Sequence, residues 1–328
     1  MDNWFGIPRL AILLFVALLA CGAKPDAGLS EPTQLTISHS QKTVDFLPLW
    51  IASDGGYFEK HGLNVTVRYL PAQEGIPALL AGQTQVAGIG GADAASAEAQ
   101  GARLKLVATL TPNYIFQFWA RPDHANASAL KGQSIGITST TGSLYAATLL
   151  ALKELGLSAS DVVLTPLGGV TNVNSSLLAG SIVAAASHPP ATYQFKRAGL
   201  VDLVDLAKKD IPSVNAGLWF TEDFTKAHSD VVQNVVDAVI EAIQREKSDR
   251  AFAVNEISKH LGVRDKEEID FTYDFYVNEV LAAGPMPKVV QLQSNIDALA
   301  AKNPKVKTID PAVMIDQTFV KNAEKPRT

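Results

Sequence analysis

The sequence predicts an α/β fold with two lobes, each a mainly parallel sheet flanked by helices. From residue 35 onward, short apolar runs of strand length alternate with amphipathic runs of helix length, which is the order typical of α/β layers. The tetrapeptide LLAG occurs at 79–82 and again at 177–180, each time at the end of a helical run and just before a run of small residues. After about residue 228 only helical patterns remain. We therefore expect a repeated sheet unit and a helical C-terminal region that packs on the first lobe.

The N-terminal residues predict export and a lipid anchor. An apolar run at 10–20 follows Arg9 and is much shorter than the ~20 residues of a membrane-spanning helix, as in the core of a signal peptide. It ends in LLACG at 18–22, which resembles a bacterial lipobox, and Cys21 is the only cysteine of the chain. We expect removal of residues 1–20, acylation of Cys21, and a position in the periplasm or on the cell surface. An ordinary secretory peptide is the alternative.

Composition sets bounds on the remaining chain. Because the single cysteine belongs to the predicted anchor, the folded part has no disulfide and depends on an apolar core, for which 47% apolar residues suffice. A net charge of −5 provides no broad basic surface, so we expect no nucleic-acid partner. Residues 21–33 are small, polar and interrupted by proline, which predicts a tether.

The strand and helix patterns divide the folded part into two lobes. Strand-length runs occupy 35–38, 64–70, 85–90 and 104–110, and then 134–138, 161–167 and 181–187. The helical runs are 47–61, 74–81, 92–100, 143–155 and 171–179, followed by 229–247, 249–261, 265–282 and 289–301. Two extended aromatic runs, 116–123 and 214–224, are interpreted as crossings between the lobes. The first lobe is then 34–118 plus 220–328, and the second lobe is 119–219.

Several phrases of the sequence resemble a known family. The runs FLPLWIA at 46–52 and GGYFEKHGLNV at 55–65 are similar to the opening of the ABC-transporter substrate-binding proteins for nitrate, sulfonates, taurine and thiamine-pyrimidine precursors. Further family phrases follow in order, namely ALLAGQ at 78–83, GARLK at 101–105, LKGQSIG at 130–136 and ALKELGL at 151–157. The resemblance implies the type 2 periplasmic-binding-protein fold, in which two hinged lobes close over a small molecule like a Venus flytrap. It also implies an ABC permease as partner, a monomer and no cofactor.

The candidate binding site lies at the carboxyl ends of strands, where ligands bind in open α/β sheets. The loop 139–143 carries four hydroxyl residues, follows a strand run and opens a helix, so backbone N–H groups and hydroxyls converge on one point. A helix N-terminus attracts an anionic or strongly polar group. Because the loop has no Lys or Arg, a sulfonate, a carboxylate or a neutral polar ligand is favoured over a phosphate. A simple capping role for Thr141 or Ser143 is the alternative.

The facing element is the turn GGAD at 90–93, which ends another strand run. Asp93 either stabilises the dipole of its own helix or, if it faces the cleft, favours a ligand amine. Aromatic side chains near the predicted mouth, including Trp50 and Trp219, belong either to the core or to the ligand site. The candidate ligand contacts are Phe46, Leu47, Gly90, Gly91, Tyr114, Thr140, Thr141, Gly142, Ser143, His188 and Asn215.

No enzyme motif is present in the sequence. There is no GxSxG or HExxH, and the histidines at 39, 61, 124, 188, 228 and 260 have no metal-ligand spacing, so we expect neither catalysis nor a metal site. The run 88–93 begins like a dinucleotide fingerprint but ends in an aspartate where a small residue is needed. The enzyme branch of the resembled family makes the thiamine pyrimidine with a cysteine-rich motif that this chain lacks. We expect a solute-binding component of an ABC importer; an exported enzyme or a stand-alone sensory binding protein is the alternative.

Overall fold

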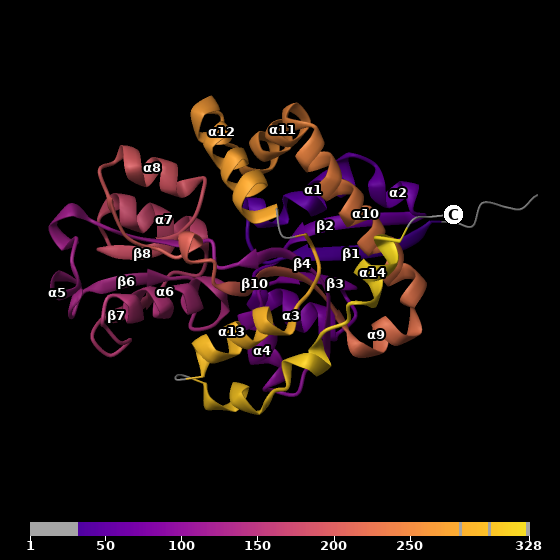
Figure 1. The fold of residues 1–328 in the computed structure, drawn as a ribbon, viewed down its shortest axis with the longest axis horizontal. Helices are drawn as coiled ribbons and strands as arrows, with labels where there is room; N and C mark the ends of the chain where they lie inside the picture. The colour runs from indigo at the N-terminus through magenta and orange to yellow at the C-terminus, as the bar shows by residue number, and fades with distance from the viewer. Residues whose placement is uncertain (1–31, 282–283, 301–302, 326–328) are drawn as a thin grey trace, which may run out of the picture. The chain divides into compact units, whose positions relative to one another are not determined.

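The computed structural model describes residues 32–281, 284–300 and 303–325, which form two five-stranded sheets, each flanked by helices (Figure 1). The predicted signal peptide, the acylation site Cys21 and most of the tether lie outside the described residues. Within the described ranges, none of the helices combines the length and the apolar character that a bilayer crossing requires.

The first sheet has the strand order β2-β1-β3-β10-β4. β1 pairs in parallel with β2 and β3, whereas β10 pairs antiparallel with β3 and β4, so four of the five strands run in one direction. The strands are β1 Thr33–His39, β2 Leu63–Tyr69, β3 Val86–Ile89, β4 Leu104–Asn113 and β10 Pro212–Thr221.

The second sheet repeats this arrangement in the order β7-β6-β8-β5-β9. β6 pairs in parallel with β7 and β8, and β5 is the one antiparallel strand, between β8 and β9. The strands are β5 Gln117–Ala120, β6 Ser134–Ile137, β7 Val163–Pro166, β8 Ala184–Ser187 and β9 Val201–Asp205. The predicted α/β class with two mainly parallel lobes is confirmed, with one antiparallel strand added to each lobe.

The two aromatic runs form the antiparallel strands themselves. The chain leaves the first sheet after residue 113 and enters the second at 117, and it returns between 205 and 212. Both passages begin before the aromatic runs 116–123 and 214–224 that we interpreted as the crossings. The aromatic side chains account for the shift, because Phe118 and Trp219 are fully buried on sheet faces instead of spanning the gap between lobes.

Alternation of side chains along the strands fixes which helices cover each face of the second sheet. Phe118 and Ala184 belong to the core under α6 (Gly142–Glu154), whereas their strand neighbours Trp119 and Ala185 pack with α7 (Val170–Ala179) and α8 (Ala191–Arg197). Figure 1 shows α6 on one side of this sheet and α7 and α8 on the other. The small residues of β8 let these helices approach closely. A short helix, α5 (Ala127–Leu130), precedes β6.

Helices from both ends of the chain cover the first sheet. One face carries α1 (Leu47–Asp54), α2 (Tyr57–Lys60), α10 (Ser229–Ser248) and α11 (Arg250–Leu261), and the other carries α3 (Ala72–Leu80), α4 (Gly91–Glu98) and α13 (Val289–Leu299) (Figure 1). The helical C-terminal region is therefore present as predicted, and it also reaches the second lobe through α12 and α13. Further α-helices are α9 Glu222–Ala227, α12 Lys266–Phe275 and α14 Thr318–Ala323, and a π-helix spans Tyr276–Val280.

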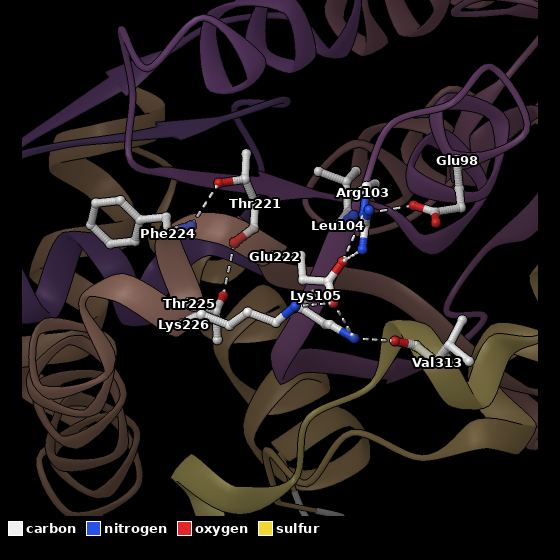
Figure 2. A network of polar contacts seen from close by, with 10 residues as sticks. All are labelled: Glu98, Arg103, Leu104, Lys105, Thr221, Glu222, Phe224, Thr225, Lys226 and Val313. Atoms are coloured by element: carbon white, nitrogen blue, oxygen red, sulfur yellow. Dashed lines mark hydrogen bonds and ion pairs between the residues drawn. The ribbon is translucent and has the colours of Figure 1, made fainter.

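A network of charges joins the start of β4 to the end of β10 (Figure 2). The Glu222 carboxylate pairs with Arg103, with Lys226 at 2.8 Å and with Lys105 at 3.9 Å, and Lys105 also donates to the carbonyl oxygen of Val313. Hydrogen bonds from Lys226 and Arg103 lower the pKa of Glu222 to about 2. This network holds the C-terminal segment against the first sheet.

Candidate ligand-binding cleft

A cleft lies where the carboxyl ends of both sheets meet. It has two compartments of about 240 Å³ and about 230 Å³, which share Lys42, Val170 and Thr171 in their walls. We call them the Asp93 compartment and the His188 compartment. Because parallel strands end at one edge of a sheet, the loops after β1, β3, β6, β7 and β8 all reach this place. The Asp93 compartment is lined by Ser40, Gln41, Lys42, Tyr69, Pro71, Ala72, Gln73 and Asp93 of the first lobe and by Thr138, Ser139, Gly142 and residues 168–172 of the second.

Asp93 stands at the N-terminus of the facing helix α6. Its Oδ1 accepts a hydrogen bond from Thr141 Oγ1 at 3.1 Å. A Cβ on Gly142 would lie 2.9 Å from Asp93 Oδ2, and Gly142 has a φ of 84°, so both space and backbone conformation require glycine there. The helix end that we expected to meet an anionic ligand therefore meets a carboxylate of the first lobe.

Burial sets the charge preference of Asp93. The residue is 8% exposed, and its desolvation raises the pKa of the carboxyl to about 6, while the hydrogen bond from Thr141 acts in the opposite direction. At neutral pH this side chain is a buried carboxylate for which a single hydrogen-bond donor is found among the described residues. It also lines the wall of the Asp93 compartment, so it faces the space that a solute would enter.

A second contact between the lobes lies beside Asp93. Ser143 Oγ donates to the carbonyl oxygen of Asn215 at 3.1 Å, and a Cβ on Gly90 would lie 2.2 Å from the same Oγ. A Cβ on Gly91 would lie 2.5 Å from Oδ1 of Asn295. Gly90, Gly91 and Ser143 thus permit close packing of α4, α6 and α13, and they are not among the residues that line either compartment.

His188 belongs to a buried polar network that spans both lobes. Its Nδ1 lies 2.9 Å from the hydroxyl of Tyr276, and that hydroxyl donates to Asp45 Oδ2 at 3.2 Å. Asp45 also accepts from Thr43 at 2.7 Å and from Asn215 Nδ2 at 2.9 Å. Burial and the Asp45 carboxylate raise the pKa of Tyr276 well above its usual value. The network connects the loop after β1, the end of β8, strand β10 and the π-helix.

Two polar atoms of this network are available to form hydrogen bonds with a ligand. Among the described residues, neither His188 Nε2 nor Asn215 Oδ1 has a hydrogen-bond partner, although both are buried. Nε2 lies 3.6 Å from Asp45 Oδ2. His188 lines its compartment together with His260 of α11 and Pro189 and Pro190. Within the described part of the chain, the network therefore offers one ring nitrogen and one amide oxygen that lack a hydrogen-bond partner.

The structure places the other sequence candidates away from the cavity walls. Phe46 and Leu47 are buried in the core of the first lobe, where the Phe46 ring lies against Gly88. Tyr114 is fully buried, and its hydroxyl accepts a hydrogen bond from Asn295 Nδ2 at 2.9 Å. Thr140 is exposed and lines neither compartment. The apolar candidates differ from expectation because a large apolar side chain next to a strand end gains more from the core than from a polar cleft.

Sequence reasoning missed much of the first-lobe wall. Lys42 and Tyr69 lie near each other, with Lys42 Nζ 5.2 Å from the centre of the Tyr69 ring. The opposite wall includes the glycines and polar residues of 168–172, which follow β7. A signal for this loop existed, because two glycines directly after a strand run mark a close backbone approach.

Comparison with known proteins agrees with this arrangement. The family model described as NMT1/THI5 like matches residues 43–249. RibY, a riboflavin-binding protein of Chloroflexus aurantiacus, is 28% identical over 178 residues, which cover 48% of this chain and 51% of RibY, so the chain spans about half the length of this curated relative. A structure from Bordetella bronchiseptica RB50 has a TM-score of 0.77 at 22% identity, covering 89% of this chain and 97% of that one. The alkanesulfonate-binding protein SsuA of Xanthomonas axonopodis pv. citri, bound to MOPS, has a TM-score of 0.72 at 20% identity, covering 88% and 100%.

These likenesses confirm the type 2 periplasmic-binding-protein fold, and the family match confirms the resemblance found in the motifs. The matched residues run from the loop after β1 to the start of α11, so they include every strand beyond β1 and most of the cleft wall. The chain therefore belongs to the NMT1/THI5-like family.

Proposed function

We propose that this protein is the extracytoplasmic, lipid-anchored solute-binding component of an ABC importer. The observation that carries this proposal is a cleft walled by both lobes at the carboxyl ends of both sheets. A solute held there contacts both lobes, so its binding favours the arrangement in which they are together. The similarity to a riboflavin-binding protein and to an alkanesulfonate-binding protein supports a small-molecule ligand. The permease subunits of the importer would then be the partner.

The wall of the Asp93 compartment favours a solute with a hydrogen-bond donor. Asp93 is a buried carboxylate beside the α6 N-terminus, and a small oxyanion placed there would face a like charge at close range. An amino group or a ring N–H instead supplies the donor that the carboxylate lacks. Lys42 and Tyr69, on the same wall, suit an acceptor group and a flat ring. Of the compounds considered from sequence, taurine and aminopyrimidines meet these conditions better than nitrate.

Calorimetry with the purified chain tests this function. The panel is taurine, an alkanesulfonate without an amino group, nitrate, benzoate, an aminopyrimidine and riboflavin. We expect heat of binding from at least one compound that carries an amino group or ring N–H, and none from nitrate. Chemical conversion of a bound compound would refute the binding-protein function and favour an exported enzyme. Binding without loss of uptake after deletion of the neighbouring permease would favour a stand-alone sensor.

The anchor is tested separately. The LLAC pattern supports acylation of Cys21. In cells given a labelled fatty acid, the natural chain should carry label and sediment with membranes, and Cys21→Ser should do neither. A Cys21→Ser chain that still carries label would remove this part of the proposal while leaving the cleft untouched.

A further inference from the structure

A separate cluster of metal-ligating side chains lies where α1 ends against α11. Glu256 and His260 are four residues apart on α11, so they share one face of that helix, and Asp54 is the last residue of α1. His260 Nε2 lies 2.6 Å from Asp54 Oδ2 and 3.4 Å from Glu256 Oε2. All three potential ligand atoms lie within 4.8 Å of one another.

We propose that Asp54, Glu256 and His260 bind a divalent transition metal, with Zn²⁺ the best match. Imidazole nitrogen and carboxylate oxygen are ordinary zinc ligands, and bonds of about 2.0–2.2 Å in tetrahedral geometry place neighbouring ligand atoms roughly 3.3 Å apart. The distances from His260 Nε2 to Asp54 and to Glu256 lie on either side of that value. Three protein ligands leave one position for water. The spacing of the histidines alone predicts no metal site, because the other two ligands are carboxylates and one of them, Asp54, lies on a different helix.

One carboxylate oxygen of the cluster, Glu256 Oε2, indicates a bound cation. Glu256 is 3% exposed, and its Oε2 has no hydrogen-bond partner among the residues that the structure describes. This oxygen is directed at His260 Nε2 and shares the site with the Asp54 carboxylate. Of the three side chains only Glu256 is buried, and two carboxylates that converge on one point are stabilised by positive charge between them. A metal ion would supply it at the point where all three ligand atoms converge.

The surroundings already orient the ligands. The Trp50 ring stacks on the His260 imidazole, with centroids 4.7 Å apart and an interplanar angle of 10°. Asn255 Nδ2 donates to Glu256 Oε1 at 3.3 Å, which leaves Oε2 as the free oxygen. Contacts of this kind, made by residues that do not touch the metal, fix the rotamers of metal ligands in proteins.

Lys259 is the competing cation. Its Nζ lies 2.7 Å from Asp54 Oδ2 and 3.7 Å from Glu256 Oε2, and its side chain is 53% exposed, so the ammonium can turn into solvent when a metal binds. An ion-pair network without any metal is the alternative explanation of the cluster. The two explanations differ in one prediction, because removal of Lys259 weakens an ion-pair network but frees a metal site from its competitor.

Titration with Zn²⁺, and with Co²⁺ followed by its visible absorption, tests the site on the full chain after treatment with a chelator. We expect binding of one ion, weakened at least about tenfold by His260→Ala and by Glu256→Gln, and strengthened by Lys259→Ala. His61→Ala is the matched control. His61 Nε2 lies 3.0 Å from Glu241, with Lys60 alongside, but this cluster has only one carboxylate.

The variants distinguish a metal site from an ion-pair network without a metal. Unchanged binding in His61→Ala together with loss in His260→Ala and Glu256→Gln supports the site, and circular dichroism confirms that each variant is folded. Equal affinity in His260→Ala and in the natural chain, or weaker binding in Lys259→Ala, would overturn the proposal. The site does not depend on the proposed function, since Zn²⁺ titration needs no solute. His260 also lines the His188 compartment, so a bound ion would lie at the edge of the solute cleft.

Discussion

The substitution Asp93→Asn measures the cost of holding a buried carboxylate in the wall of the cleft. Burial raises the folded-state pKa of Asp93 from 3.8 to about 6, so the folded protein binds a proton more tightly than the unfolded chain. The stability that this proton provides is fully present below the unfolded value and is lost as the pH rises through about 6. The difference between a pKa of 3.8 and one of about 6 corresponds to about 3 kcal/mol. At pH 7.5 the ionised side chain therefore lowers the free energy of unfolding by about this amount.

Asparagine has nearly the same shape, cannot ionise, and keeps an oxygen for the hydrogen bond from Thr141. We expect Asp93→Asn to unfold at higher denaturant concentration than the natural chain at pH 7.5, by about 3 kcal/mol, and to match it near pH 4. Tryptophan fluorescence in urea at several pH values gives both free energies. Solute affinity should fall in the same variant, because the carboxylate that meets the donor is gone.

The control is Asp230→Asn, which removes another carboxylate from the first turn of a helix, here an exposed one in α10. It loses only a favourable dipole interaction, worth about 0.3–1 kcal/mol, so its stability should fall slightly. If the difference between Asp93→Asn and the natural chain stayed constant from pH 4 to 7.5, the reasoning from burial would be refuted.

Three further predictions concern other parts of the molecule. Tyr114→Phe should cost about 1 kcal/mol in urea unfolding, because Asn295 loses an acceptor, while calorimetric solute affinity stays unchanged. Thr141→Ala should strengthen solute binding several-fold, because it removes the donor that competes with the solute for Asp93, and unchanged affinity would remove this loop from the site. The pKa of Glu222 is lowered to about 2, so its stabilisation is present above the unfolded value near 4.5 and is lost below it. The stability gap between Glu222→Gln and the natural chain should therefore close as the pH falls from 5 to 2.

Much of the fold follows from local pattern. The alternation of apolar runs and helical periodicity locates β1 to β4 and β6 to β8, and the repeated LLAG marks the ends of α3 and α7 before β3 and β8. The pattern could not assign β5 and β10, because an aromatic run suits a buried antiparallel strand as well as a linker. β9 was missed altogether, since its sequence VDLVD alternates over only five residues.

The site was less accessible to sequence reasoning. The loop 139–143 was located through its helix N-terminus, and His188 and Gly142 do line the cleft. The partner of that helix end was not identified, because the approach of Asp93 to Thr141 depends on how two separate sheets meet. Nothing local distinguishes Tyr114, which is buried, from Tyr69, which is 40% exposed on the cleft wall. Only the packing of distant elements decides between them.

The contact between Asp93 and Thr141 sets a threshold for what the cleft accepts. Thr141 of the second lobe donates a hydrogen bond to the Asp93 carboxylate of the first lobe, so a solute that binds the same oxygen competes with Thr141. The affinity of a solute then reflects the difference between its own contact with Asp93 and the Thr141 contact that it replaces. A compound without a hydrogen-bond donor gains nothing at this position. In the proposed importer, a permease that detected only contact between the lobes would not distinguish the protein with solute from the protein without it.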